Sequence, residues 1–344
     1  MEKMRAMVLS ECAPIETNPL KLTEIDRHEI KKQNEILIKI EACGVCHSQL
    51  HGIEGDWKHL GIPPTLPTVP GHELVGKVVE IGKEVTKFKV GDRAGITPLL
   101  EACKNCQYCK DGKEYLCESS IITGESFKGG YTEYITVVQD FATKVPDNMK
   151  PEYAAPLFCA GITAFKAVKA AQPQPHKKIG IFGIGGVGHM AVQFAKVEGC
   201  DVIAFSRNQN HLDVANRLGA ADSMVFSANQ ENFLNEIKDK HGMLDAAIVF
   251  APSDVVTDTA IKSVKKGGTI VIATIGEKLS FIAFEEKTIR GTLIGSTKDM
   301  EQVIKICNEE NLEVIFETYP LEKANEVLKK LKDSQIEARA VLIP

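Results

Sequence analysis

The chain has 344 residues, a formal net charge of −5 at pH 7, and a composition of 44% hydrophobic and 25% charged residues. A chain of this length is too long to fold around one hydrophobic core of ordinary size, so we expect two domains. The composition is typical of globular proteins. The mild negative charge, without a basic block, argues against partners such as nucleic acid or an anionic membrane surface.

The N-terminal segment and the cysteine content indicate a compartment. Residues 1–9 lack the long apolar core and the cleavage site of a secretory signal. The sequence has no run of roughly 18 apolar residues, which is the length that a membrane-spanning helix needs. We therefore expect a cytoplasmic protein without a membrane partner, in which the ten cysteines serve as metal ligands more readily than as disulfides.

The first third of the chain predicts a β-rich domain. Residues 35–40 alternate apolar and polar side chains, which is typical of a half-buried strand. Residues 46–50 are expected to open a helix, and the proline-rich residues 52–70 are expected to form a loop. Glycine turns join two further expected strands at 74–82 and 90–94.

A cluster of chemically active residues begins at Cys46. Residues 46–51 hold a soft metal ligand, a hydroxyl and two imidazoles, and an imidazole and a carboxylate follow at His72 and Glu73. Cys159 lies much later, in a run of small apolar residues. Two cysteines and a histidine from distant segments match the ligands of a catalytic zinc that keeps a fourth position open.

Four more cysteines lie close together in a polar segment, at Cys103, Cys106, Cys109 and Cys117. Polar neighbours exclude a hydrophobic core, and the short spacing lets the chain wrap one tetrahedral ion. We therefore predict a closed structural zinc site, which stabilises its lobe and performs no chemistry. An iron–sulfur centre and two short disulfides are the alternatives.

The second part of the chain alternates strands and helices. An apolar strand at 178–182 leads into a glycine-rich turn and a helix. Gly183 permits the tight turn, Gly185 lets the backbone approach a pyrophosphate, and Gly188 lets helix and strand pack closely. The N-terminus of that helix would face the anion.

The remaining elements predict a doubly wound parallel sheet. Further strands are expected at 201–205, 246–250, 269–273 and 291–295, helices at 301–308 and 321–331, and a strand at 339–343 that returns to the first domain. The predicted domains are a nucleotide-binding domain at 157–297 and a β-rich domain at 1–156 and 298–344.

Five motifs together resemble the zinc-containing medium-chain alcohol dehydrogenases, and among them the yeast-type and cinnamyl-alcohol-dehydrogenase-like branches. They are residues 44–48, residues 71–73, the four-cysteine segment, residues 159–163 and residues 183–189, and in this order they cover nearly the whole chain. The resemblance implies an α/β protein, with a doubly wound Rossmann cofactor domain and a β-rich GroES-like catalytic domain that carries the structural zinc lobe.

The resemblance also implies roles for individual residues. Cys46, His72 and Cys159 would hold the catalytic zinc, with Glu73 close to the metal or as an alternate ligand. Ser48 would take the substrate proton and pass it through the cofactor ribose to His51. His47 and Arg339 would hold the pyrophosphate, and Thr163 would contact the nicotinamide. With the glycine motif, the full set of predicted cofactor contacts is His47, Thr163, Gly183, Gly185, Gly186, Val187, Gly188, Ser206, Arg207, Ile275 and Arg339.

Two positions depart from the family pattern. Gln49 stands where these families usually carry Asp, so His72 would lack a charged hydrogen-bond partner. Pro98 replaces a bulky aromatic residue of the yeast-type enzymes, which predicts a wider alcohol pocket. Trp57 and Leu99 are candidates for its wall, although Trp57 as a cover of the core edge is an equal alternative.

The implied reaction is reversible hydride transfer between a primary alcohol or aldehyde, aliphatic or aryl, and NADP(H), with two zinc ions per chain. NADP is expected over NAD because Ser206 leaves room and Arg207 can pair with a 2′-phosphate. The alternative is that Arg207 is a solvated surface charge.

Other classes of protein share part of this pattern. An NAD-dependent alcohol or polyol dehydrogenase shares the ligands, but polyol branches commonly carry Glu in place of Cys159. A non-catalytic nucleotide-binding protein would lack the zinc ligands that this chain retains. The expected assembly is a homodimer or a homotetramer.

Overall fold

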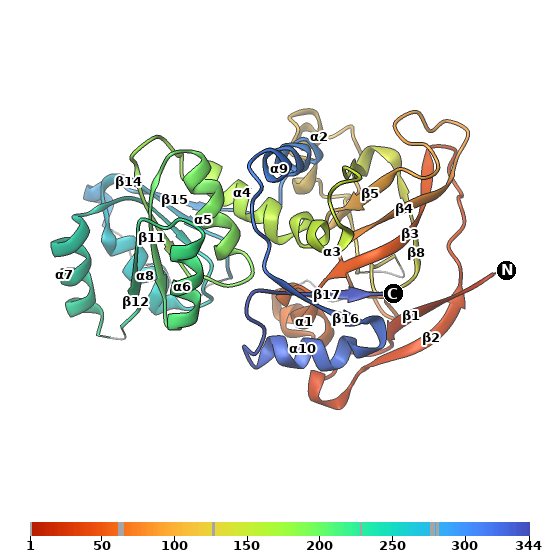
Figure 1. Cartoon of the computed structure of the whole chain (residues 1–344), viewed down its shortest axis with the longest axis horizontal. Helices are drawn as coiled ribbons and strands as arrows, with labels where there is room; N and C mark the ends of the chain where they lie inside the picture. The colour runs from red at the N-terminus through yellow and green to blue at the C-terminus, as the bar shows by residue number, and fades with distance from the viewer. Residues whose placement is uncertain (1, 61–64, 126–127, 228, 276–278, 280–281) are drawn as a thin grey trace. The chain divides into compact units, whose positions relative to one another are not determined.

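The computed structural model describes residues 2–60, 65–125, 128–227, 229–275, 279 and 282–344 (Figure 1). The chain forms two compact units. Unit 1 comprises Met1–Cys159, Gly295–Asn308 and Val314–Pro344, and unit 2 comprises Ala160–Ile294 and Glu309–Glu313.

Unit 1 is built from β-sheets. Its strands are β1 (Lys3–Leu9), β2 (Leu20–Asp26), β3 (Glu35–Gly44), β4 (Glu73–Ile81), β5 (Arg93–Ile96), β6 (Leu99–Glu101), β7 (Ile121–Ile122), β8 (Tyr134–Val138), β9 (Ala142–Lys144), β16 (Phe316–Pro320) and β17 (Arg339–Ile343). Seven of them form one sheet in the order β16-β17-β3-β4-β5-β9, with β8 also paired to β3, and β1-β2 and β6-β7 form two-stranded sheets.

Helices connect these strands, and all but α9 are shorter than ten residues. They are η1 (Ile15–Thr17), α1 (His47–Glu54), η2 (Asp56–Leu60), α2 (Gln107–Lys110), η3 (Glu114–Leu116), η4 (Gln139–Phe141), α3 (Pro151–Ala154), η5 (Ala155–Phe158), α9 (Thr297–Glu309), η7 (Leu321–Lys323) and α10 (Ala324–Lys332). The helix expected to open at residue 46 is thus α1, and its last turn and η2 occupy part of the stretch that was predicted to be a loop. Residues 61–64 of that stretch lie outside the described residues.

Of two predicted strands of unit 1, one pairs as expected and the other begins later than expected. The predicted return of 339–343 to the first domain is confirmed, because β17 pairs in parallel with β16 and antiparallel with β3. The strand predicted at 90–94 begins only at Arg93, since Gly91, with φ +93°, bends the chain just before it.

Unit 2 contains the predicted doubly wound sheet. Its elements are α4 (Ala160–Ala170), β10 (Lys178–Phe182), α5 (Gly188–Val197), β11 (Asp201–Ser206), α6 (Gln209–Arg217), β12 (Asp222–Val225), α7 (Gln230–His241), β13 (Leu244–Val249), α8 (Asp254–Ser263), β14 (Val264–Ile272), η6 (Ala283–Glu285) and β15 (Thr288–Gly291). The strand order is β12-β11-β10-β13-β14-β15 and every pair is parallel. The last strand lies three residues earlier than the expected 291–295.

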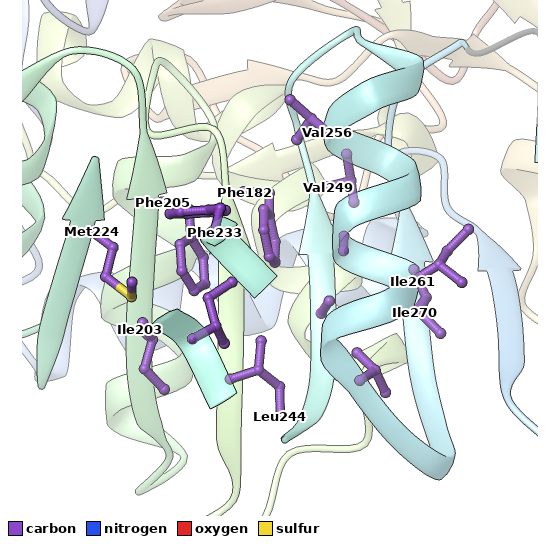
Figure 2. Close-up of a cluster of buried hydrophobic side chains, with 14 residues drawn as sticks. Phe182, Ile203, Phe205, Met224, Phe233, Leu244, Val249, Val256, Ile261 and Ile270 are labelled. Atoms are coloured by element: carbon purple, nitrogen blue, oxygen red, sulfur yellow. The ribbon is translucent and has the colours of Figure 1, made fainter. Parts of the chain in front are cut away.

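Aromatic side chains fill one layer of the unit 2 core. Phe182 and Phe205, on neighbouring strands, stack with ring centroids 4.3 Å apart, and Phe233 of α7 meets Phe205 edge-on at 5.9 Å. Figure 2 shows these rings grouped on one side of the cluster, with Val256 and Ile261 of α8 on the other. This packing fixes the end of β10, where the glycine turn begins.

Among the helices of the described residues, none is long and apolar enough to cross a membrane.

Candidate metal centre and nucleotide-binding turn

Four potential ligands meet in unit 1: Cys46, His72, Glu73 and Cys159. One ligand atom from each residue lies within 4.8 Å of the others. The Sγ atoms of Cys46 and Cys159 are 3.9 Å apart. Two sulfurs bound at ~2.3 Å to one tetrahedral zinc would lie about 3.8 Å apart. The donor set and its spacing therefore fit a zinc ion.

The pairing of β3 with β4 builds one side of this cluster. Gly44, the last residue of β3, pairs with Glu73, the first residue of β4. A Cβ at Gly44 would lie 2.1 Å from Oε2 of Glu73, so glycine is needed for the carboxylate to fit. Cys46 follows as the N-cap of α1, and His72 immediately precedes β4. Two neighbouring strand ends thus supply three of the four ligands.

A buried ion pair lies beside the ligands. Nη2 of Arg339, on β17, donates to both carboxylate oxygens of Glu73. Burial raises the pKa of the Glu73 carboxyl, and the positive charge of Arg339 opposes that rise. The sequence did not indicate this pairing. Because the guanidinium already has a partner within unit 1, the predicted role of Arg339 at a pyrophosphate stays a prediction.

The two thiols of the cluster share a hydrogen bond. Their mutual hydrogen bond lowers the pKa of Cys46 well below its ordinary value and raises that of Cys159. The Ser48 hydroxyl donates to Sγ of Cys46 at 3.1 Å and lies 3.4 Å from Nε2 of His72. Ser48 therefore lies at the cluster, and its role in proton transfer stays a prediction.

Gln49, which stands where the family usually carries Asp, contacts the imidazole of His72. Its amide Nε2 faces Nδ1 of His72 at 2.7 Å. Its Oε1 instead accepts from the backbone N–H of Gly71 at 2.6 Å. Gln offers one acceptor oxygen to two neighbours, whereas a carboxylate would offer two. The family departure at this position thus changes the hydrogen bonding of a ligand.

The helix α1 carries a second imidazole one turn beyond Ser48. Nδ1 of His51 lies 2.7 Å from Oδ2 of Asp56, and its ring stacks on Trp57 with centroids 5.1 Å apart. The His51 side chain is partly exposed, so it contacts solvent while it lies on the same helix as Ser48. Asp56 was not among the predicted site residues, although a carboxylate five residues after a candidate relay histidine is a usable signal.

A recess opens beside Ser48. Its volume is about 30 Å³, and Trp57, Ile53, Pro70 and Glu125 are part of its lining. Trp57 therefore lies at a recess wall. Leu99, the other candidate for the wall, is buried within β6.

The four-cysteine lobe forms a second cluster of unit 1. One sulfur from each of Cys103, Cys106, Cys109 and Cys117 lies within 4.8 Å of the others, and those of Cys103 and Cys109 are 3.9 Å apart. Backbone N–H groups donate to the sulfurs of Cys117 and Cys103. Hydrogen bonds from backbone N–H groups lower the pKa of Cys103 to about 6. All four sulfurs surround one point, which fits a single tetrahedral ion.

In unit 2 the glycine turn follows β10, the strand from which the sheet extends in both directions. Gly183 has φ +101°, and its N–H donates to the Phe205 carbonyl at 2.9 Å. A Cβ on Gly188 would lie 2.0 Å from the Gly183 carbonyl oxygen, while one on Gly185 would meet nothing within 4 Å. The turn therefore packs tightly on one side and is open at Gly185, which is the geometry that a pyrophosphate site needs.

The end of β11 carries the residues expected near a ribose. Oγ of Ser206 accepts from the backbone N–H of Asn208 at 3.2 Å and lies 3.5 Å from Nδ1 of His211. Arg207 is exposed beside it. His211 lies on the first turn of α6 and was not among the predicted residues, because only its spacing from Ser206 signals it.

The other predicted cofactor contacts belong to different units. His47 is the exposed first residue of α1 and Arg339 is buried, both in unit 1. In unit 2, Thr163 is half-buried on α4 and Ile275 is 55% exposed after β14. Gly186 and Val187 complete the turn before α5.

Comparison with known proteins agrees with both halves of the chain. The alcohol dehydrogenase GroES-like domain matches residues 32–147, and the zinc-binding dehydrogenase family matches residues 186–309. An alcohol dehydrogenase of Geobacillus stearothermophilus is 39% identical over 329 residues, which are 94% of this chain and 96% of that protein. The chain therefore belongs to the zinc-binding alcohol dehydrogenase family of medium-chain dehydrogenases.

Solved structures extend the agreement to the fold. Acetophenone reductase from Geotrichum candidum, in complex with NAD, matches with a TM-score of 0.88, 28% identity, and 100% and 98% of the two chains. The protein named CAD from Helicobacter pylori, complexed with NADP(H), matches with a TM-score of 0.85, 26% identity, and coverage of 99% of this chain and 97% of that chain. The fold thus combines a GroES-like and a Rossmann part, and the chain is an alcohol dehydrogenase whose cofactor preference these neighbours leave open.

Proposed function

We propose that this alcohol dehydrogenase depends on zinc and transfers hydride reversibly between a primary alcohol or aldehyde and NADP(H). The observation that carries the proposal is the cluster of Cys46, His72, Glu73 and Cys159 beside an accessible recess. In this proposal Cys46, His72 and Cys159 hold the ion, and Glu73 remains paired with Arg339. When bound, zinc would supply Lewis acidity that makes the alcohol proton easier to remove.

The protein side chains then bind the alcohol and move its proton. Ser48 Oγ lies at the cluster edge and lines the recess, so it is placed to accept that proton. Ser48 and His51 are three residues apart on α1 and share a face of the helix. The proton would pass from Ser48 by way of the cofactor ribose to His51, which Asp56 holds and which would release it to solvent. Apolar recess walls, such as Ile53 and Trp57, exclude water from the reacting carbon.

We assign unit 1 as the catalytic domain and unit 2 as the cofactor domain. The open side of the turn at Gly185 and the N-terminus of α5 would bind the cofactor pyrophosphate. This assignment agrees with the domain families matched by residues 32–147 and 186–309.

The preference for NADP rests on the end of β11. NAD-binding turns commonly place a carboxylate there, which accepts the ribose hydroxyls and repels a 2′-phosphate. This chain has Ser206 and the exposed Arg207 instead, with His211 next to the serine. A hydroxyl, a guanidinium and an imidazole together suit a phosphate better than a diol.

Arg207→Ala tests the cofactor preference. Loss of a charge-assisted contact should lower kcat/KM with NADP by about 10- to 100-fold relative to NAD. Steady-state rates with both cofactors measure this ratio, and Lys238→Ala, which removes an exposed cation from α7, is the control. A wild-type preference for NAD, or an unchanged ratio in Arg207→Ala, contradicts the assignment.

The metal content tests the zinc dependence. We expect two zinc ions per chain by elemental analysis, one in each cysteine cluster. A panel of primary aliphatic and aryl alcohols should be oxidised by this form and not after the metal has been removed with a chelator. One ion per chain, or full activity without metal, contradicts the proposal.

We also propose that the chain assembles as a homodimer or homotetramer through unit 2. In the described part of the sheet β15 is paired on one side only. Nearby Phe284 and Ile282 are 92% and 60% exposed, and an uncovered apolar surface beside a free strand edge favours association. Light scattering should therefore give at least twice the monomer mass, and Phe284→Glu should lower it.

A further inference from the structure

Glu125 is an unexpected residue in the recess beside Ser48. It lies in the segment between β7 and β8, directly after Gly124. Gly124, with φ +85°, is packed so closely that a Cβ would lie 2.8 Å from Oε1 of Gln49 and from the Gly71 carbonyl oxygen. Its carbonyl accepts from Thr68 Oγ1 at 3.3 Å. The backbone that carries Glu125 is thus held against the residues around His72.

Much of the recess around Glu125 is apolar. Leu9, Ile53, Trp57 and Pro70 are part of its lining. Burial raises the pKa of the Glu125 carboxyl, and the nearby His72 opposes that rise. A half-buried carboxylate is costly unless it receives hydrogen bonds.

Within the described residues, which exclude 126–127, the Glu125 carboxylate has no hydrogen bond or ion pair. Glu125 is only partly buried and lines the recess. A polar group that is accessible and unpaired within a largely apolar site is the kind of group that selects a ligand. The missing donor would therefore come from whatever occupies the recess.

We infer that Glu125 is a specificity-determining residue that accepts a hydrogen bond from a second donor on the substrate, remote from the reacting hydroxyl. The preferred substrates are then primary alcohols that carry a further hydroxyl or an ammonium group. This inference rests on the proposed function, because it treats the recess beside Ser48 as the alcohol site. Ser48 would meet the reacting end of the substrate and Glu125 the polar tail.

Matched substrates test the inference. The compounds 1-pentanol, 1,4-butanediol and 4-amino-1-butanol have the same number of heavy atoms and end in a methyl, a hydroxyl and an ammonium group. Shorter and longer members of each series vary the distance between the reacting hydroxyl and the terminal group. In the wild type, the best donor-bearing alcohol should exceed its methyl counterpart by about 10- to 100-fold in kcat/KM, as expected for a hydrogen bond to a charged group. Glu125→Met should bring this ratio close to one.

Glu125→Gln separates the two sources of the donor. It keeps an acceptor oxygen and removes the charge, so a preference for the hydroxyl should persist in part and one for the ammonium should disappear. Glu24→Met, at an exposed position of β2, is the matched control and should leave all ratios unchanged. Melting temperature and zinc content should be the same in all variants.

A binding measurement makes the test independent of turnover. Trp57 is the only tryptophan of the chain and lines the same recess, so its fluorescence reports occupancy directly. The ratio of dissociation constants for the methyl and donor-bearing compounds should be above about 10 in the wild type and near one in Glu125→Met. If no alcohol is oxidised with either cofactor, the proposed function fails, but this ratio still decides the role of Glu125. Equal ratios in wild type and Glu125→Met, in both measurements, overturn the inference.

Discussion

The two cysteine clusters of unit 1 have the same 3.9 Å sulfur spacing and reach it by different routes. In the lobe, the four ligands lie within residues 103–117, and backbone N–H groups of that segment donate to the sulfurs. In the other cluster, Cys46 and Cys159 are 113 residues apart and are held by strand register, by Ser48 and by a buried ion pair. A local site can be complete by itself and closed. A site assembled from distant segments can leave one side open to a recess.

The largest expected effect is at the assembled cluster. Cys46→Ser replaces a soft thiolate ligand with a weak one, so kcat/KM should fall by at least about 100-fold. The lobe does not depend on this residue, so the variant should fold and retain one of two zinc ions. Activity assays, elemental analysis and circular dichroism measure these changes. Normal turnover in Cys46→Ser would show that the cluster is not catalytic.

Cys106→Ser should have the opposite profile. Removing one ligand from a closed site loses metal-binding free energy that supports folding, on the order of several kcal/mol. The melting temperature should therefore fall, while kcat per folded, metal-loaded molecule stays close to that of the wild type. Calorimetry, with activity corrected for the folded fraction, measures both. A loss of kcat without a loss of stability would mean that the lobe, like the assembled cluster, takes part in catalysis.

Glu73→Gln tests the ion pair that only the assembled cluster has. It leaves the buried Arg339 guanidinium without a counter-charge, which typically costs about 3–5 kcal/mol of the free energy of unfolding. Urea unfolding at constant zinc measures the loss. Asp26→Asn, which breaks the exposed pair with Lys3, is the control and should change little. An equal, small loss in both variants would mean that the buried pair does not stabilise the fold.

The smallest expected effect is at Gln49. Gln49→Asp adds a negative charge beside His72 and provides oxygens for both His72 and the Gly71 N–H. Glu73 does not already supply that charge freely, since Arg339 compensates it. A more electron-rich metal should move the ascending limb of the pH profile of alcohol oxidation to higher pH, with zinc content unchanged. Gln49→Asn, of the same length without charge, is the control, and an unmoved or lowered limb contradicts the prediction.

The sequence predicted best those features that depend on short spacing or on a family motif. The lobe follows from the spacing of Cys103, Cys106 and Cys109, and the alternation of strand and helix predicted the parallel sheet of unit 2. The resemblance predicted that Cys46, His72 and Cys159 would lie together, and the structure brings them together. Their metal binding and the cofactor roles remain predictions.

Other features depend on contacts that no local pattern encodes. The pairing of Glu73 with Arg339 requires β17 to pair with β3 and β3 to pair with β4. Only then does the guanidinium of Arg339 lie near the first residue of β4. Glu125 reaches the recess only because Gly124 packs against Gly71, and the amide orientation of Gln49 follows from the Gly71 N–H. Long-range register, not composition or periodicity, decides these positions.

The place of Arg339 on β17 also sets the order in which the two clusters can be completed during synthesis. All four thiols of the lobe have left the ribosome once residue 117 has emerged, so that site can mature early. Glu73 gains its partner only when Arg339 of β17, 266 residues later in the chain, has been translated. Until then the carboxylate beside His72 has no counter-charge, and the growing chain carries one finished cysteine site and one unfinished one.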